Sequence, residues 1–97
     1  MGPDGHTASL FPGSAGLHEE VRWVIGNWAP AQESWRMTLT FPVLAAGRNV
    51  LFVVTGEDKA DALRGIRDGT SDLPAARVAG DGVEWIVDAA AGGENAD

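Results

Sequence analysis

The sequence predicts an α/β fold with a partial, open and mainly parallel sheet flanked by helices. Segments rich in strand-forming residues alternate along the chain with segments of helical composition, which is typical of α/β architectures. The stretch Asn49–Thr55 is apolar without alternation, as expected of a strand buried on both faces in a parallel sheet. The composition, 44% hydrophobic and 22% charged, is that of an ordinary globular chain, and 97 residues suffice for one domain or part of one.

The first part of the chain is expected to form a loop followed by two strands. Residues 1–18 are rich in glycine, proline and serine and predict a loop, with one helical turn over Thr7–Leu10. Val21–Ile25 is rich in β-forming residues and predicts a strand, after which residues 29–34 interrupt the pattern. Arg36–Phe41 alternates between polar and apolar residues, which predicts a half-buried strand.

This alternation also predicts which side of the second strand faces the core. The apolar side chains on one face are expected to be buried: Met37, Leu39 and Phe41. The polar side chains share the other face: Arg36, Thr38 and Thr40.

The second part of the chain is expected to contain helices around two further strands. Proline is tolerated in the first turn of a helix, so Pro42–Arg48 predicts a short one before the apolar strand. Glu57–Asp68 predicts a second helix, with Thr55 and Asp58 arranged like a capping box. The remaining segments are a loop at Gly69–Pro74, a turn at Gly80–Gly82, a strand at Val83–Val87, a helical turn at Asp88–Ala91 and a disordered tail at 92–97.

The charge and residue usage exclude several classes of protein. A net charge of −7 argues against a nucleic-acid-binding module, which needs a basic face to neutralise phosphates. No apolar run approaches the roughly 20 residues that span a bilayer, so we expect no membrane association. The absence of cysteine excludes a disulfide scaffold and a thiol nucleophile, and it fits a cytoplasmic location.

The triplet Asp4-Gly5-His6 is the first candidate catalytic feature. Histidine transfers protons near neutral pH, and a carboxylate two residues away can orient the imidazole and stabilise its cation. Gly2 and Gly5 let the backbone approach a ligand closely and offer unobstructed amides for binding it. The alternative is an ordinary Asp-Gly turn with a bystander histidine on the surface.

Two cations are candidates for binding an anion. Lys59 follows a buried strand and a glycine turn at the start of a helix, where α/β folds bind anionic ligands. The alternative is a surface lysine that pairs with Glu57 or Asp61. Arg36 begins the alternating strand and can hold a phosphate through two hydrogen bonds, although it can equally be a plain edge-of-strand charge.

Other reactive residues give weaker signals. His6, His18 and nearby acids have no recognisable metal-ligand spacing, so we expect no metal site. No serine lies in a Gly-x-Ser-x-Gly elbow, which argues against a serine hydrolase. Trp28 and Trp35 flank the polar interruption and can line a pocket, although packing is the commoner role of tryptophan.

Several segments together resemble the 6-phosphogluconolactonases of the glucosamine/galactosamine-6-phosphate isomerase superfamily. Residues 2–13 (GPDGHTASLFPG) closely resemble the signature loop of this family. Weaker matches in the right order reinforce it: Arg36–Thr40 (RMTLT), Gly56–Ala60 (GEDKA), Leu73–Ala76 (LPAA) and Trp85–Ala91 (WIVDAAA). The resemblance covers residues 1–91 and implies the C-terminal part of a larger, Rossmann-like domain.

The resemblance implies hydrolysis of 6-phospho-D-glucono-1,5-lactone to 6-phosphogluconate in the oxidative pentose phosphate pathway. It implies that His6 is the general base that activates water and that Asp4 supports His6 or the sugar hydroxyls. Arg36 and Lys59 would hold the 6-phosphate. No metal or organic cofactor is expected, because a lactone is an activated ester and water is the only co-substrate.

Other interpretations remain open at this point. In the related glucosamine-6-phosphate deaminases a glutamate stands five residues after the histidine, where this sequence has Phe11, so that activity is disfavoured. Ser34-Trp35 replaces the family's usual Pro-Pro before the arginine. Because the family is about two and a half times longer, we expect an apolar face and a sheet edge to be open. The chain is then marginally stable or self-associating, or an inactive binding module.

Overall fold

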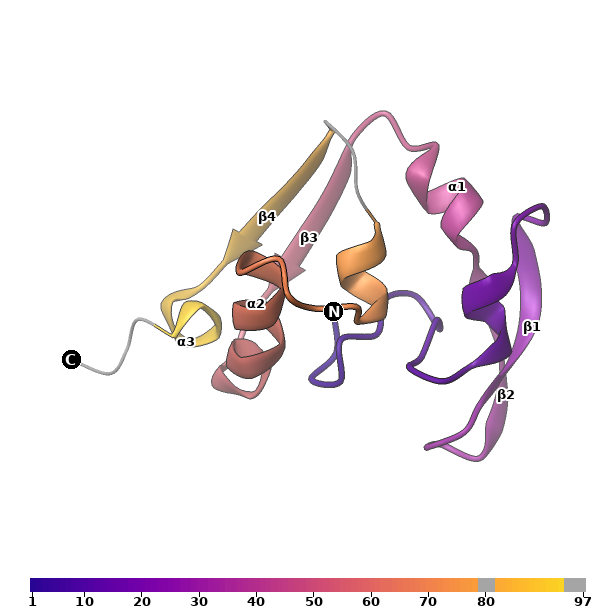
Figure 1. The fold of residues 1–97 in the computed structure, drawn as a ribbon, viewed down its shortest axis with the longest axis horizontal. Coiled ribbons are helices and arrows are strands. Elements are labelled where there is room, and N and C mark those ends of the chain that lie inside the picture. Colours follow the sequence, from indigo (N-terminus) through magenta and orange to yellow (C-terminus); the bar gives the residue numbers. More distant parts are fainter. Residues whose placement is uncertain (79–81, 94–97) are drawn as a thin grey trace.

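The computed structural model describes residues 1–78 and 82–93 and shows an α/β arrangement with two separate two-stranded sheets (Figure 1). The strands are β1 (Val24–Ala29), β2 (Ser34–Leu39), β3 (Val50–Val54) and β4 (Val83–Val87). The α-helices are α1 (Phe41–Ala45), α2 (Ala60–Arg67) and α3 (Ala89–Gly92). Three 3₁₀ helices complete the set: η1 (Ala15–His18), η2 (Glu57–Lys59) and η3 (Pro74–Arg77).

Strands β3 and β4 form the parallel sheet that the sequence predicts, joined by a crossover through α2. Phe52 pairs with Trp85 in the register of this sheet, and their rings stack 4.1 Å apart between centroids. The core lies on the side of the sheet covered by helices, and its buried members are Phe52, Val54, Leu63, Ala75, Val78 and Ala91. The predicted strand Val83–Val87 and the α/β class are therefore confirmed.

The expectation that β3 is buried on both faces is wrong for this chain. Phe52 and Val54 are buried, but the side chain of Leu51 is 56% exposed and Val53 is similarly exposed. The reason is that α2, η3 and α3 cover one face of the two-stranded sheet, and no element of the described residues covers the other. The open apolar face that the sequence led us to expect is therefore present.

The β1–β2 hairpin corrects the predicted burial of its second strand. Met37 is 73% exposed and Leu39 is also exposed, whereas Thr38 is 3% exposed and Thr40 is fully buried. The predicted alternation is present but the buried and exposed faces are inverted, because the loop before β1 packs on the polar face and satisfies its hydrogen-bonding groups. Phe41 lies outside the strand, is half-buried, and begins α1.

Several element boundaries also differ from the expected ones. Strand β1 begins at Val24, three residues later than expected, and continues to Ala29. Thr7–Leu10 forms a turn closed by a 2.9 Å hydrogen bond from Leu10 N–H to the Thr7 carbonyl, with no helical turn. The short helix expected at Pro42–Arg48 is α1, which begins at Phe41 and ends at Ala45.

The expected helix Glu57–Asp68 is divided into η2 and α2, and its capping box does not form. The carboxylate of Asp88 accepts a hydrogen bond from Ala91 N–H and so caps the start of α3. It also accepts from Gly56 N–H, just before η2. Gly92, the first residue of the expected tail, is the last residue of α3, and Gly93 follows it in a left-handed conformation. Residues 94–97, and Gly80 and Asp81 of the expected turn, lie outside the described residues.

No helix in residues 1–78 and 82–93 combines the length and the apolar character needed to cross a membrane.

Candidate active site

The segment Gly2–His6 closes on itself to form a tight loop. Gly2 N–H donates to the His6 carbonyl at 3.0 Å, and Gly5 N–H donates to the Gly2 carbonyl at 2.9 Å. The carbonyl of Gly5 in turn accepts from Ala75 N–H at 2.9 Å, which fixes the loop to η3. The amides of both glycines are used inside the loop, so their predicted role in substrate binding stays a prediction.

The two glycines have a clear steric role in the loop. A Cβ at Gly2 would lie 2.2 Å from Cε1 of His6, so only a glycine leaves room for the imidazole. Gly5 has a φ of +83°, and a Cβ there would lie 2.6 Å from Cβ of Leu73. The Asp-Gly-His spacing therefore depends on glycine at both positions.

The central feature of the loop is the contact between Asp4 and His6. Nδ1 of His6 lies 2.6 Å from Oδ1 of Asp4, and the same oxygen accepts from His6 N–H at 3.0 Å. Partial burial raises the pKa of Asp4, but the hydrogen bonds from the backbone and side chain of His6 outweigh it, and the pKa lies below its usual value. Asp4 is therefore a carboxylate that favours the Nδ1–H tautomer of His6.

The rest of the imidazole is held by packing and remains accessible. The rings of His6 and the buried Phe11 lie 4.5 Å apart between centroids, with a 37° angle between their planes. The side chain of His6 is 29% exposed, and no hydrogen bond to its Nε2 is present among the described residues. With Nδ1 bonded to a carboxylate, Nε2 is free to accept a proton from water.

Lys59 is the last residue of η2, which follows β3, and it contacts groups of its own turn. Its Nζ donates to the Thr55 carbonyl at 3.0 Å and lies 3.2 Å from Oδ1 of Asp58. The expected alternative pairing with Glu57 or Asp61 is not what the structure shows.

Arg36 is exposed on β2, and its Nε donates to Oγ of Ser34 at 3.0 Å. In the view of Figure 1 the amino-terminal loop runs between α2 on one side and the β1–β2 hairpin on the other. Within the described residues, no hydrogen bond or ion pair joins His6 to Arg36 or Lys59. The structure thus brings Gly2, Asp4, Gly5 and His6 together and leaves the two cations on flanking elements.

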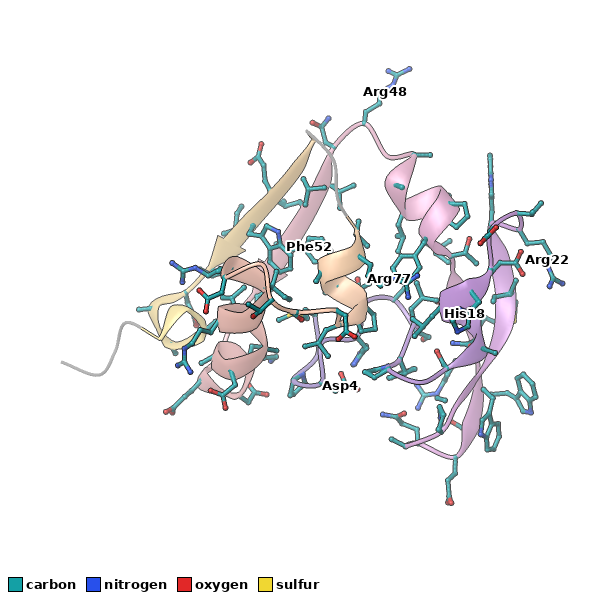
Figure 2. The ribbon with its side chains drawn as sticks, viewed as in Figure 1. Asp4, His18, Arg22, Arg48, Phe52 and Arg77 are labelled. Atoms are coloured by element: carbon teal, nitrogen blue, oxygen red, sulfur yellow. The ribbon has the colours of Figure 1, made fainter. Side chains whose placement is uncertain are left out.

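Arg77, which the sequence does not distinguish, lines a cleft of about 490 Å³ together with His18. Figure 2 labels both side chains. The guanidinium of Arg77 lies 4.5 Å from the centroid of the Phe41 ring and donates to the Leu17 carbonyl at 3.1 Å. No motif distinguishes this arginine from a surface charge. Among the described residues there is no group of three histidines, cysteines or acids that could hold a metal ion.

Comparisons with known proteins agree on one family. The profile described as "Glucosamine-6-phosphate isomerases/6-phosphogluconolactonase" matches residues 1–87. The chain is 43% identical over 93 residues to the probable 6-phosphogluconolactonase 2 of Arabidopsis thaliana, covering 94% of this chain and 36% of the relative. It is 52% identical over 81 residues to the 6-phosphogluconolactonase of Rattus norvegicus, covering 80% and 31%.

A solved structure supports the same relationship. The 6-phosphogluconolactonase of Trypanosoma brucei superposes with a TM-score of 0.81 at 30% identity, over 99% of this chain and 40% of that one. The chain therefore spans about a third of the length of the curated relatives that it matches.

Proposed function

The chain belongs to the glucosamine-6-phosphate isomerase/6-phosphogluconolactonase family, and we propose that it acts in the hydrolysis of 6-phospho-D-glucono-1,5-lactone. The observation that carries the proposal is the Asp4–His6 contact of 2.6 Å, which leaves Nε2 of an accessible imidazole without a partner among the described residues. The product is 6-phospho-D-gluconate, formed in the oxidative pentose phosphate pathway.

In the proposed reaction His6 acts first as base and then as acid. Nε2 takes a proton from water while the water oxygen attacks the lactone carbonyl carbon and forms a tetrahedral intermediate. The bond from this carbon to the ring oxygen then breaks, and the imidazolium returns its proton to that oxygen. Asp4 stabilises the imidazolium between the two steps, because its carboxylate stays ionised and accepts a hydrogen bond from Nδ1–H.

The phosphate of the substrate is proposed to bind to Arg36 and Lys59. A guanidinium and an ammonium suit a phosphate dianion, and both residues lie in segments that resemble motifs of the family. Lys59 would exchange its contacts with Thr55 and Asp58 for the phosphate. Hydrolysis of the lactone requires no organic cofactor or metal, since a lactone is an activated ester. We propose the cytoplasm as the location of the reaction.

The deaminase alternative gains no support from the site. The position of the glutamate in deaminases is filled by Phe11, whose ring is buried against His6 and offers no acid or base. An inactive chain that binds a sugar phosphate or another protein remains the competing outcome of the experiment below.

The experiment is a lactonase assay of this chain by acid release at constant pH, corrected for spontaneous hydrolysis of the lactone. The matched variants are His6→Ala and His18→Ala, which remove one each of the two histidines in the chain. We expect activity above background that His6→Ala abolishes and His18→Ala retains. Activity that is absent from the unmodified chain, or equally reduced by both substitutions, contradicts the proposal.

A further inference from the structure

We propose that Asn27 and Thr38, two buried polar residues of the β1–β2 hairpin, position the imidazole of His6 through the segment that follows it. We refer to these two residues as the hairpin anchor. The role rests on the proposed function, in which His6 is the base, but its structural part can be measured without any activity.

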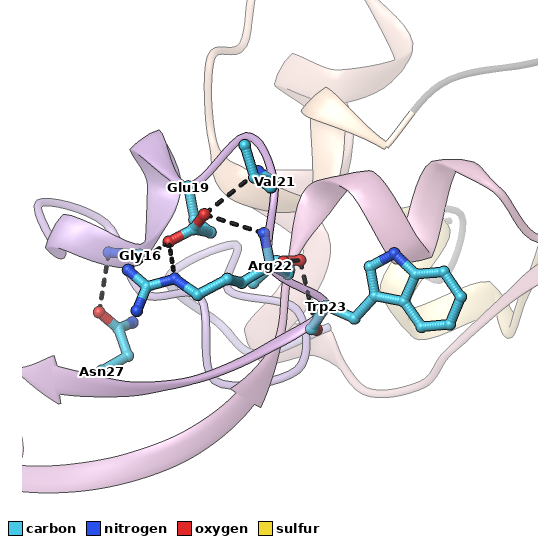
Figure 3. Close-up of polar contacts among 7 residues, drawn as sticks. Gly16, Glu19, Val21, Arg22, Trp23 and Asn27 are labelled. Carbon is cyan, nitrogen blue, oxygen red and sulfur yellow. Dashed lines mark hydrogen bonds and ion pairs between the residues drawn. The ribbon is translucent and has the colours of Figure 1, made fainter.

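Asn27 uses its amide to hold the loop at three points. It is 2% exposed, and its Nδ2 donates to the Ser9 carbonyl at 2.9 Å and to Oγ of Ser14 at 3.0 Å. Its Oδ1 accepts from Gly16 N–H at 2.8 Å, as Figure 3 shows. A Cβ at Gly16 would lie 2.8 Å from this amide, so the contact leaves no space for a larger residue. A buried amide with each of its polar atoms bonded fixes the segment that it binds.

Thr38 holds the same segment from the neighbouring strand. Its Oγ1 accepts from Ser9 N–H at 2.9 Å and donates to the Leu39 carbonyl at 2.8 Å. Ser9 therefore has both of its backbone polar groups bound by hairpin side chains, three residues after His6.

The path from the hairpin anchor to His6 runs through Ser14 and Phe11. Oγ of Ser14, which accepts from Asn27, donates to the Phe11 carbonyl at 2.7 Å, and Ser14 N–H donates to it at 3.1 Å. The ring of Phe11 then lies against the imidazole. The imidazole thus lies between the Asp4 carboxylate and the ring of Phe11. The carbonyl of Phe11 is bonded to Ser14, which the hairpin holds through Asn27.

Thr40 shows how a residue with a purely structural role would behave. It lies on the same face of the strand end as Thr38 and is fully buried, but its hydroxyl contacts the carbonyl groups of Arg22 and Trp23, within the hairpin region itself. Thr38→Val and Thr40→Val therefore each delete one buried threonine hydroxyl, at neighbouring sites. Of the two residues, only Thr38 binds the loop that carries His6.

The test is solution NMR of the full chain, reading the His6 ring protons and their nuclear Overhauser effect to the Phe11 ring. His6→Ala assigns the two histidine signals, and the exposed His18 serves as an internal control. We expect Thr38→Val to shift the His6 signals and to remove the effect to Phe11. We expect Thr40→Val and Thr38→Ser, which keeps the hydroxyl, to retain both.

In the lactonase assay Thr38→Val should lower kcat about 10- to 100-fold with little change in KM, since misplacing a catalytic group acts on the chemical step. Ser14→Ala deletes one hydroxyl of the path, and it tests the same inference if Thr38→Val does not fold. Unchanged His6 signals in a folded Thr38→Val or Ser14→Ala variant, or equal shifts in Thr40→Val, overturn the inference. Shifted His6 signals in a chain without activity leave it intact and remove the proposed function.

Discussion

Nδ1 of His6 and Oδ1 of Asp4 lie 2.6 Å apart, within hydrogen-bonding distance. A carboxylate at this place selects the tautomer whose Nε2 lone pair can accept a proton. The sequence suggests the pairing, and the structure shows the carboxylate within hydrogen-bonding distance of the imidazole.

Asp4→Asn is therefore expected to impair catalysis without unfolding the loop. The amide can bind the other imidazole tautomer, so the proposed lactonase activity should fall by about 10²- to 10⁴-fold. The measurement is kcat/KM together with ¹⁵N shifts of the imidazole, which report the tautomer. The exposed Asp72 provides the control substitution Asp72→Asn, and equal activity of the two variants would contradict the role of Asp4.

Gly5→Ala is expected to destabilise the chain more than Gly13→Ala. Both glycines have a left-handed φ, +83° and +76°, which costs an alanine about 1 kcal/mol. A Cβ at Gly5 also collides with Leu73, at a further cost of about 1–3 kcal/mol, whereas nothing lies within 4 Å of a Cβ at Gly13. Urea unfolding of the two variants gives the difference, and equal free energies of unfolding would refute the close packing at Gly5.

Glu19 is expected to stabilise the fold at neutral pH and to lose this effect in acid. Hydrogen bonds from the backbone and side chain of Arg22, and from Val21 N–H, lower its pKa from 4.5 to about 2 (Figure 3). Because the pKa is lowered by folding, the stabilisation is complete above pH 4.5 and disappears as the pH falls through 2. Unfolding midpoints of the unmodified chain and Glu19→Gln should differ at pH 7 and converge near pH 2; a constant difference would argue against this carboxylate as the cause.

Leu63→Ala in the core and Leu51→Ala on the open face of the parallel sheet are expected to have different effects on stability. Leu63 is 2% exposed within the core, so its truncation should cost about 2–5 kcal/mol. Leu51 is more than half exposed, and its truncation should leave the free energy of unfolding nearly unchanged while weakening any self-association of the chain. Unfolding curves with sedimentation equilibrium measure both effects; a large loss of stability in monomeric Leu51→Ala would show that this face is covered.

The local patterns predicted most of the elements, while the burial of their faces depended on partners far away in the sequence. Val83–Val87 is predictable because its β-branched and aromatic residues favour a strand, and the structure has β4 at these residues. Met37 and Thr38 were assigned to the wrong faces, because periodicity identifies two faces without saying which one another segment covers. The partner of Thr38 is a backbone N–H 29 residues earlier, which no local pattern reveals.

The candidate site divides in the same way. Asp4 and His6 are two residues apart, so their contact follows from a tight turn that the glycines in the sequence predict. The hairpin anchor escaped sequence analysis, because an asparagine and a threonine in strands carry no signal of their own until the loop packs on them. Lys59 was expected to be a surface charge or an anion ligand, and its bond to the Thr55 carbonyl required the actual course of the turn.

The amino-terminal loop is bonded to η3 through Gly5 and to the hairpin through Ser9, although the two sheets share no strand pairing. It therefore joins two halves that are otherwise linked by the contacts of Arg77 in η3 with the Leu17 carbonyl and the Phe41 ring. We expect a single proteolytic nick between His6 and Ser9 to weaken the coupling of the two halves, so that heat denaturation of the nicked chain is broader than that of the intact chain.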